Sequence, residues 1–306
     1  MRRTDIPWVD VADATRRQIV NDLFVERESF EPIAATMNRL REDHREGKET
    51  SCMSIVGVPG VGKSQLLKRY AAANGIITET TSDGIRRRLP VLYAELDSNI
   101  TVNDAAETIL RALLGKRAPG GSTIKNRVLP DQLEIWRVEL LIIDEFQHVG
   151  ERGRSKTRNA TADWIKSIAK KLRIPVVMAG MEVVAQLIED NEQLSSITPY
   201  RFTMPRYDFD EPEDRAAFAE LLKGLDAALP FDASSDLGDV STSNALLRAS
   251  CGYLRDLSRI VATAARLAIA DSSCAISIDH LRQACDEDMH LDCLSNPFDD
   301  PFADAA

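Results

Sequence analysis

The stretch GVPGVGKS, residues 57–64, decides the fold class more firmly than any other part of the chain. It fits the pattern Gly-x-x-x-x-Gly-Lys-Ser of a P-loop, with the apolar run CMSIVGV before it and the helix-forming run SQLLKRYAAANG after it. In a P-loop the glycines let backbone N–H groups turn toward phosphate oxygens, and the following helix adds its partial positive charge. The pattern therefore predicts a buried strand, a phosphate-binding turn and a helix in direct succession.

The P-loop residue types also predict how a triphosphate and its magnesium ion are held. Lys63 is expected to reach the β- and γ-phosphate oxygens, and the Ser64 hydroxyl is expected to bind Mg²⁺. The residues expected to contact ATP are Gly57, Val58, Pro59, Gly60, Val61, Gly62, Lys63, Ser64 and Gln65.

A second motif, VELLIIDE at residues 138–145, supplies an acidic pair at the end of an apolar, β-branched run. In P-loop enzymes an acid at this place holds magnesium, and a further polar residue orients the attacking water. We therefore expect Asp144 to hold Mg²⁺ through water and Glu145 to activate the water. The pair predicts hydrolysis of ATP as well as binding.

The rest of the chain alternates strand and helix patterns up to about residue 211. Strands are expected at 52–58, 89–96, 138–145, within IPVVMAG and within PYRFTMPRYDF; helices are expected at 28–46, 64–75, 101–115 and 157–172. Such alternation predicts an α/β fold with a parallel sheet and helices on both faces. From Glu213 onward four amphipathic helical segments follow, which indicates a small all-α domain.

These patterns predict four regions. They are an N-terminal helical extension at 1–50, the P-loop nucleotide-binding domain at 51–211, a helical lid at 212–288 and a disordered acidic tail at 289–306. The tail contains NPF at 296–298 and DPF at 300–302. A short peptide that docks on a partner and a merely solubilising segment both explain it.

The charge of the chain is unevenly distributed. The formal net charge is -10, and residues 286–306 hold seven carboxylates without Lys or Arg, which leaves -10 + 7 = -3 for the rest. Between Arg111 and Arg173 there are fourteen Lys or Arg against seven Asp or Glu, or +7. A basic region on a nearly neutral body can attract a phosphate backbone, although a well solvated surface explains it too.

The N-terminal sequence MRRTDIPWVDVAD has no apolar signal segment behind its arginines, and no apolar run has the length of a membrane helix. We therefore expect a cytoplasmic protein. Its five cysteines are too scattered for a disulfide framework. A zinc site at Cys274, Cys285, His290 and Cys293 would lack the usual C-x-x-C spacing, so free thiols are the simpler interpretation.

Three longer stretches carry a resemblance to a known family. They are DEFQHVGERGRSKTRNATADWIKSIAKKLRIPVVMAGME, RFTMPRYDFDEPEDRAAFAELLKGLDAALPF and GYLRDLSRIVATAARLAIADSSCAISIDHLRQA. Together with the P-loop and the acidic pair, they resemble the TniB/TnsC family of AAA+ transposition ATPases over roughly residues 20–285. The resemblance implies an AAA+ three-layer α/β/α sandwich followed by a helical lid.

The resemblance also implies a function. Proteins of this family are similar to regulators that bind ATP, form homo-oligomers on double-stranded DNA and mark it for a transposase, with hydrolysis driving disassembly. The implied partners are duplex DNA without sequence preference, a transposase and a target-selection protein. A helicase-loader or initiator-like AAA+ protein and a DNA-independent nucleotide switch would share the same site, and they remain alternatives.

Further site residues follow from the resemblance alone. Arg201, and less so Arg206, corresponds to the arginine that completes a neighbouring subunit's ATP site. Arg255, in GYLRDL, resembles the lid arginine that contacts nucleotide. After VVMAG, where many AAA+ proteins have a small polar residue, this chain has Met181 and Glu182. The polar residue is shifted by one, or the phosphate is sensed differently and hydrolysis is slow.

Two basic segments are candidates for contact with DNA, because non-specific duplex binding needs several cationic side chains and no base-reading motif. The candidate residues are Lys116, Arg117, Thr123, Lys125 and Arg127 in a first predicted loop, and Arg152 and Arg154 in a second. The first segment is favoured over the second.

Overall fold

A computed structural model describes residues 7–23, 27–81, 84–98, 100–116, 122–149 and 155–299. Its contacts divide the chain into two units. The α/β unit comprises Glu31–Pro59 and Lys63–Met204, and the helical unit comprises Met1–Phe30, Gly60–Gly62 and Pro205–Ala306. The predicted four-region division draws its boundaries differently, because it groups residues 1–50 together.

The α/β unit is built on a five-stranded sheet in which every neighbouring pair is parallel. The strands, in spatial order, are β4 (Val91–Glu95), β5 (Leu140–Asp144), β6 (Val176–Gly180), β1 (Met53–Val56) and β7 (Tyr200–Thr203). The predicted parallel sheet is confirmed. In a parallel sheet all strands end at the same edge, so the segments that follow β1, β5 and β6 lie close together there.

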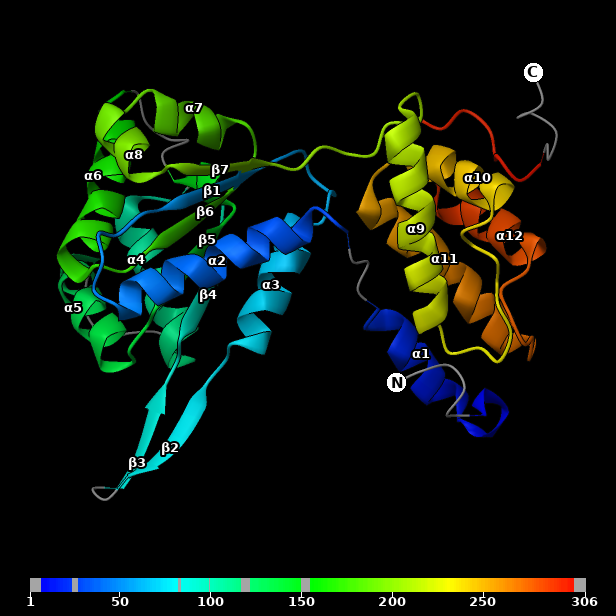
Figure 1. Ribbon diagram of the computed structural model, residues 1–306, viewed down its shortest axis with the longest axis horizontal. Coiled ribbons are helices and arrows are strands. Elements are labelled where there is room, and N and C mark those ends of the chain that lie inside the picture. Colours follow the sequence, from blue (N-terminus) through cyan, green and yellow to red (C-terminus); the bar gives the residue numbers. More distant parts are fainter. Residues whose placement is uncertain are drawn as a thin grey trace. The chain divides into compact units, whose positions relative to one another are not determined.

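Helices cover both faces of this sheet (Figure 1). They are α2 (Phe30–Arg45), α3 (Lys63–Ala73), α4 (Val102–Leu114), α5 (Ser122–Ile135), α6 (Ser155–Leu172), α7 (Val183–Glu189) and α8 (Glu192–Ile197). Burial on both faces explains why the first four residues of β5 are apolar and why the whole strand is buried. One large core cluster joins the sheet to residues of α4 to α8.

Two local features differ from the sequence-based expectation. A separate antiparallel hairpin, β2 (Ile77–Thr81) and β3 (Gly84–Arg88), projects from the unit where no strand was predicted (Figure 1). The β-branched run ITETT followed by Ser-Asp-Gly was its sequence signal. In addition, residues 122–127, predicted as part of a loop rich in Gly, Pro and basic residues, begin α5 instead.

The helical unit contains the four helices predicted after Glu213. They are α9 (Pro212–Ala228), α10 (Val240–Ser250), α11 (Leu254–Ala270) and α12 (Ile278–Asp288). A short 3-10 helix η2 (Trp8–Asp10) and α1 (Asp13–Asn21) join them, with buried Arg16 donating from Nε to Pro230 O at 3.1 Å. Within the described ranges, no helix combines the length and apolarity that a membrane crossing requires.

The tail after α12 is anchored at two buried residues, whereas Leu291 and Leu294 are almost fully exposed. Phe298 is 5% exposed, and Asn296 donates from Nδ2 to Arg282 O at 2.8 Å and to Asp286 Oδ1 at 2.7 Å. A single anchored aromatic residue leaves no periodicity in the sequence, so pattern analysis missed this packing. The DPF sequence at 300–302 lies outside the described residues.

Candidate nucleotide-binding site

The P-loop begins at the carboxyl edge of the sheet. β1 ends at Val56, and the amide of Gly57 donates to Gly180 O, at the end of neighbouring β6, with 3.2 Å between the atoms. α3 begins at Lys63, directly after the loop. The predicted succession of strand, turn and helix is therefore confirmed.

Two glycines give the loop its shape. Gly60 and Gly62 have φ values of +89° and +99°, a region in which side chains are strained. A Cβ added to Gly62 would also lie 3.1 Å from Phe30 and 3.2 Å from Leu254. Glycine is thus needed at 62 for both its conformation and its small size.

Lys63 is buried and lies against the loop itself. Its ammonium group donates to Gly57 O at 2.7 Å and to Val58 O at 3.0 Å. Burial lowers the pKa of Lys63, while the negative charges of Asp144 and Glu145 act in the opposite direction. A buried ammonium that donates its hydrogen bonds to neutral carbonyls would gain from a directly bonded anionic partner such as a phosphate.

Asp144 ends β5 and is fully buried. Its Oδ1 accepts from the amide of Glu145 at 2.9 Å, and its Oδ2 accepts from the Tyr93 hydroxyl at 2.8 Å. Burial, followed by the charge of Asp144, raises the pKa of Tyr93, so Tyr93 remains a donor. Tyr93 was missed by the sequence analysis because the neighbourhood of β4 and β5 is needed to bring it to Asp144.

Glu145 has a left-handed backbone conformation, with φ 55° and ψ 38°, and its side chain is 38% exposed. This conformation is uncommon for residues other than glycine, and it turns the chain sharply out of β5 into the 3-10 helix η3 (Phe146–His148). The side-chain amide of Gln147 donates to Glu145 Oε2. The carboxylate is thus both partly open to solvent and fixed by a neighbour.

The residues expected to bind magnesium have suitable chemistry. Ser64 lies half-buried in the first turn of α3, and Asp144 supplies a buried carboxylate at the same edge of the sheet. Mg²⁺ in nucleotide sites takes few protein ligands and completes its shell with phosphates and water. Elsewhere in the described part, no group of three or more His, Cys, Asp or Glu is placed to hold a metal ion. The Cys274, Cys285, His290 and Cys293 combination is thus not assembled as a zinc site.

The remaining predicted ATP contacts differ in exposure. Val58 is 44% exposed, whereas Val61 is fully buried and Gln65 is half-buried. Val61 therefore fixes the loop by packing. Pro59 is exposed, at the turn of the loop.

Arg201 is anchored on edge strand β7. Its Nη2 donates to Ser195 Oγ at 2.6 Å, its Nε donates to Thr198 O at 3.2 Å, and its Nη1 lies 3.6 Å from Glu189 Oε1. Its side chain is 37% exposed. These contacts hold an accessible guanidinium in one place on the surface of the α/β unit.

Two other arginines lie in the helical unit. Arg206 donates from Nη1 to Cys251 O at 3.1 Å. Arg255 is the second residue of α11 (Leu254–Ala270); its amide donates to Gly60 O at 3.0 Å, and its side chain is 59% exposed. The Arg255 side chain also lies 3.5 Å from where a Cβ of Gly60 would be. Arg255 is therefore next to Gly60, which belongs to the same unit.

The candidate DNA contacts are only partly described. Lys116, after α4, and Arg127, on α5, are both exposed. Thr123 and Lys125 lie in the first turns of α5, and their side chains are outside the described part. Arg117, Arg152 and Arg154 are also outside the described residues.

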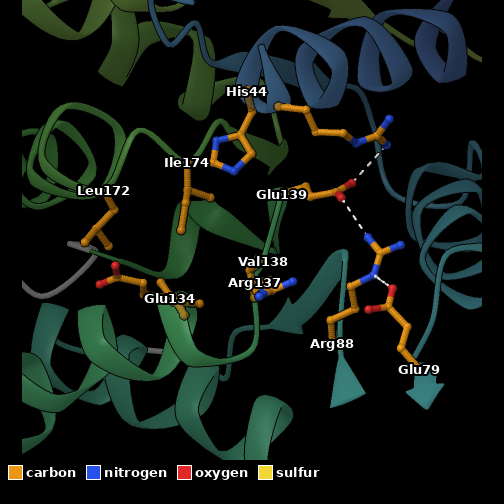
Figure 2. Close-up of a pocket in the computed structure, with 11 residues that line it drawn as sticks. His44, Glu79, Arg88, Glu134, Arg137, Val138, Glu139, Leu172 and Ile174 are labelled. Atoms are coloured by element: carbon orange, nitrogen blue, oxygen red, sulfur yellow. Dashed lines mark hydrogen bonds and ion pairs between the residues drawn. The ribbon is translucent and has the colours of Figure 1, made fainter. Parts of the chain in front are cut away.

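A separate cavity of about 730 Å³ lies at the opposite, amino-terminal edge of β5 and β6. Figure 2 shows that Glu139, immediately before β5, points toward Arg88 of the hairpin. Glu139 Oε2 accepts from Arg41 at 2.9 Å and from Arg45 at 3.0 Å, and its Oε1 accepts from Arg88 at 3.2 Å. Burial would raise the pKa of Glu139, but the hydrogen bonds from Arg45 and Arg41 outweigh it and hold the pKa below its usual value.

The family comparison matches most of the chain. The model of the family described as bacterial TniB protein matches residues 16–207, which include β1, the P-loop, β5 and β7. No curated protein is similar enough in sequence to match.

Solved structures share the fold at low sequence identity. The Aeropyrum pernix ORC2 protein in ADPNP–ADP complexes has a TM-score of 0.58 and 18% identity, covering 90% of this chain and 72% of that chain. Cdc6p from Pyrobaculum aerophilum has a TM-score of 0.58 and 13% identity, covering 89% and 71%. The Aeropyrum pernix ORC1 protein in complex with DNA has a TM-score of 0.57 and 16% identity, covering 89% and 69%. The chain therefore has the AAA+ fold of these proteins.

Proposed function

Because the chain belongs to the bacterial TniB family, we propose that it is an ATP-dependent regulator of DNA transposition. In this proposal it forms a homo-oligomer on double-stranded DNA and recruits or activates a transposase, and ATP hydrolysis drives disassembly. The observation that carries the proposal is the arrangement at one sheet edge. A P-loop follows β1 there, Asp144 ends the nearby strand β5, and Glu145 comes directly after it.

The P-loop binds the triphosphate of ATP. On binding, the Lys63 ammonium exchanges its hydrogen bonds to the carbonyls of Gly57 and Val58 for hydrogen bonds to phosphate oxygens. The buried positive charge then bonds directly to a negative group, which stabilises it. Bound Mg²⁺ would neutralise phosphate charge, with Ser64 as a direct ligand and Asp144 holding it through water. Tyr93 keeps the Asp144 carboxylate oriented by its hydrogen bond.

Glu145 accepts a proton from the attacking water. Its partly exposed carboxylate, which directly follows Asp144 at the end of β5, supports this role. Arg201 of one subunit stabilises the charge of the γ-phosphate bound to the next subunit, so that the site is complete only in the oligomer. Arg255, which is next to Gly60, contacts the nucleotide from α11. These two roles rest on the resemblance of their sequence positions.

Basic side chains bind the phosphate backbone of the duplex. The excess of Lys and Arg between residues 111 and 173 supports this step, and exposed Lys116 and Arg127 belong to that segment. Such contacts position the protein on DNA without reading the base sequence. A target-selection protein would supply the choice of site.

The proposal is tested with Glu145→Gln and Lys63→Ala, and with Glu134→Gln as a matched control on an exposed carboxylate away from the P-loop. Glu145→Gln is expected to assemble on duplex DNA with ATP as the wild type does, and to lose phosphate release. Lys63→Ala is expected to lose ATP binding and assembly together. Assembly is read by sedimentation or electron microscopy, and turnover by phosphate release.

Two results would contradict the proposal. If Glu145→Gln fails to assemble with ATP and DNA while it remains folded, ATP does not act as the assembly signal. If the protein co-purifies with a replicative helicase and not with a transposase, the helicase-loader alternative describes it better.

A further inference from the structure

Gln147 connects the candidate general base to the strand next to the P-loop. It lies in η3, and only 8% of its surface is exposed. Its Nε2 donates to Glu145 Oε2, and its Oε1 accepts from the amide of Met181 at 3.2 Å. Met181 directly follows β6, whose last residue, Gly180, accepts from the P-loop amide of Gly57. A continuous chain of hydrogen bonds thus runs from the P-loop to Glu145.

The two partners of Gln147 dictate the orientation of its amide. A backbone N–H such as that of Met181 can only donate, and an ionised carboxylate such as that of Glu145 can only accept. Glutamine is the side chain of this length that offers an acceptor to the first and a donor to the second. Glutamate in its place would keep the acceptor and lose the donor, and leucine would lose both.

The backbone beside Gln147 leaves room for this amide. A Cβ on Gly180 would lie 2.1 Å from Gln147 Oε1 and 2.8 Å from Val184. A side chain at 180 would therefore displace the Gln147 amide. The position of the Gln147 amide therefore depends on glycine at position 180.

This arrangement bears on the place after β6 where a small polar side chain is expected. Met181 and Glu182 stand there, and Met181 is 44% exposed. The polar group that meets the backbone at this place comes from Gln147 instead.

We propose that Gln147 is a positioning residue that fixes the Glu145 carboxylate relative to the P-loop. The inference rests on the proposed ATP hydrolysis by Glu145. Gln147 itself does not contact the nucleotide. It holds one carboxylate oxygen so that the other is directed to the water.

The test separates turnover from binding in the full-length protein with duplex DNA. Gln147→Glu keeps the size and the acceptor for Met181, but it replaces the donor to Glu145 with a second carboxylate. Gln147→Leu, which removes the donor without adding a charge, is therefore assayed beside it and should show the same loss. We expect kcat to fall roughly 10- to 100-fold, as for loss of a partner that orients a functional group. The Kd for ATP should stay within about twofold, because a group acting only on the transition state changes kcat and not binding. Gln186→Glu, the same change at an exposed position of α7, is the control and should behave as wild type.

A second route reaches the same amide without altering Gln147. Gly180→Ala should also lower kcat with little change in Kd, since its Cβ displaces the amide. Gln147→Leu and the double variant with Gly180→Ala should then have about the same kcat, because coupled changes are not additive. Thermal unfolding of each variant confirms that it is folded at the assay temperature.

The outcomes are distinguishable. A kcat of Gln147→Glu within about twofold of wild type, or fully additive losses in the double variant, would overturn the inference and leave the proposed function intact. A parallel loss of Kd and kcat would make Gln147 a general structural residue and also overturn it. Absence of turnover in the wild type would overturn the proposed function first, and this inference with it.

Discussion

Two carboxylates bracket β5 and lie in opposite environments. Glu139, before the strand, is 8% exposed at its side chain and receives hydrogen bonds from three guanidinium groups. Glu145, just after the strand, is 38% exposed, has a left-handed backbone and receives a donor from Gln147. The first carboxylate is neutralised by its partners, and the second retains an oxygen for other contacts.

The two ends of β5 therefore have different roles: the Glu139 end stabilises the fold, and the Glu145 end can take part in a reaction. The Glu139 cluster joins α2, the β2–β3 hairpin and the start of β5, and Arg41 extends it to Asn74, after α3, at 2.6 Å. Its charges satisfy one another, which stabilises the fold and leaves little reactivity. At the other edge, Lys63 is held by carbonyls and Glu145 by an amide, so both charges remain available to a ligand. Substitutions at the Glu139 end should therefore change the free energy of unfolding, and substitutions at the Glu145 end should change the rate of ATP hydrolysis.

The largest effect is expected for turnover in Glu145→Gln. Loss of a general base lowers a rate by roughly 10²- to 10⁴-fold. The free energy of unfolding should change by less than about 0.5 kcal/mol, since the side chain is partly exposed and glutamine can keep a hydrogen bond. Phosphate release and urea unfolding check the two parts. A large loss of stability would mean that both ends of β5 are structural.

Glu139→Ala should show the reverse. Removing one partner of a buried ion pair costs about 3–5 kcal/mol, because the remaining charges are left uncompensated. We expect this decrease in the free energy of unfolding, with kcat retained at a temperature where the variant is folded. Glu134→Ala, an exposed carboxylate lining the same cavity, is the control and should change stability by about 0–1 kcal/mol. If the two substitutions lowered the free energy of unfolding equally, the ion pairs of Glu139 would not stabilise the fold more than an exposed carboxylate does.

Tyr93→Phe should have an intermediate effect on stability. It removes the hydroxyl donor to Asp144 and leaves a buried carboxylate oxygen without that partner. A hydrogen bond to a charged group contributes about 1.5–3 kcal/mol. Urea unfolding should show a loss of that size, and the Mg²⁺ concentration needed for half-maximal turnover should rise. Unchanged stability would indicate that water replaces the hydroxyl.

The Glu139 cluster also predicts a pH dependence. The pKa of Glu139 is lower in the folded protein than its ordinary value of 4.5, so on acidification the unfolded state takes up the proton at a higher pH than the folded state. The stability that Glu139 contributes is therefore fully present above about pH 4.5 and is lost as the pH falls through the lower, folded-state pKa. The difference in unfolding free energy between wild type and Glu139→Ala should be constant near neutral pH and shrink in acid. A difference that grows in acid would contradict the sign.

The smallest effect is expected for the DNA contacts. Each phosphate contact contributes about 0.9 to the slope of log K against log salt concentration. Lys116→Ala with Arg127→Ala should reduce the slope by about two if both side chains touch the backbone. Filter binding or fluorescence anisotropy over a salt series measures it. An unchanged slope would exclude both residues from the interface.

Local patterns predicted much of the α/β unit. The P-loop between β1 and α3, the apolar β5 ending in Asp144, and the α4 helix capped by Thr101 and ended by Gly115 all appear where the sequence indicates. Each depends on residues close together in the chain. A glycine-rich turn, an apolar run and a capping residue are visible without knowledge of the fold.

Contacts between distant segments were not predictable in the same way. Tyr93 reaches Asp144 only because β4 lies beside β5, and Gln147 meets Met181 only because β5 lies beside β6. Glu139 carries no local signal of the arginines that surround it. The β2–β3 hairpin did have a local signal in Ser-Asp-Gly. Its two strands are short and lie between stretches with helix and strand patterns, so the signal was overlooked.

The proposed role of ATP is tested most directly by comparing the rate of phosphate release with the rate at which the protein leaves DNA. Wild-type and Glu145→Gln proteins are assembled on duplex DNA with ATP, free ATP is then removed, and phosphate release and loss of protein from DNA are followed together. The account predicts that wild-type protein leaves the DNA at the rate of phosphate release and that Glu145→Gln stays bound. Equal departure of both proteins would contradict it.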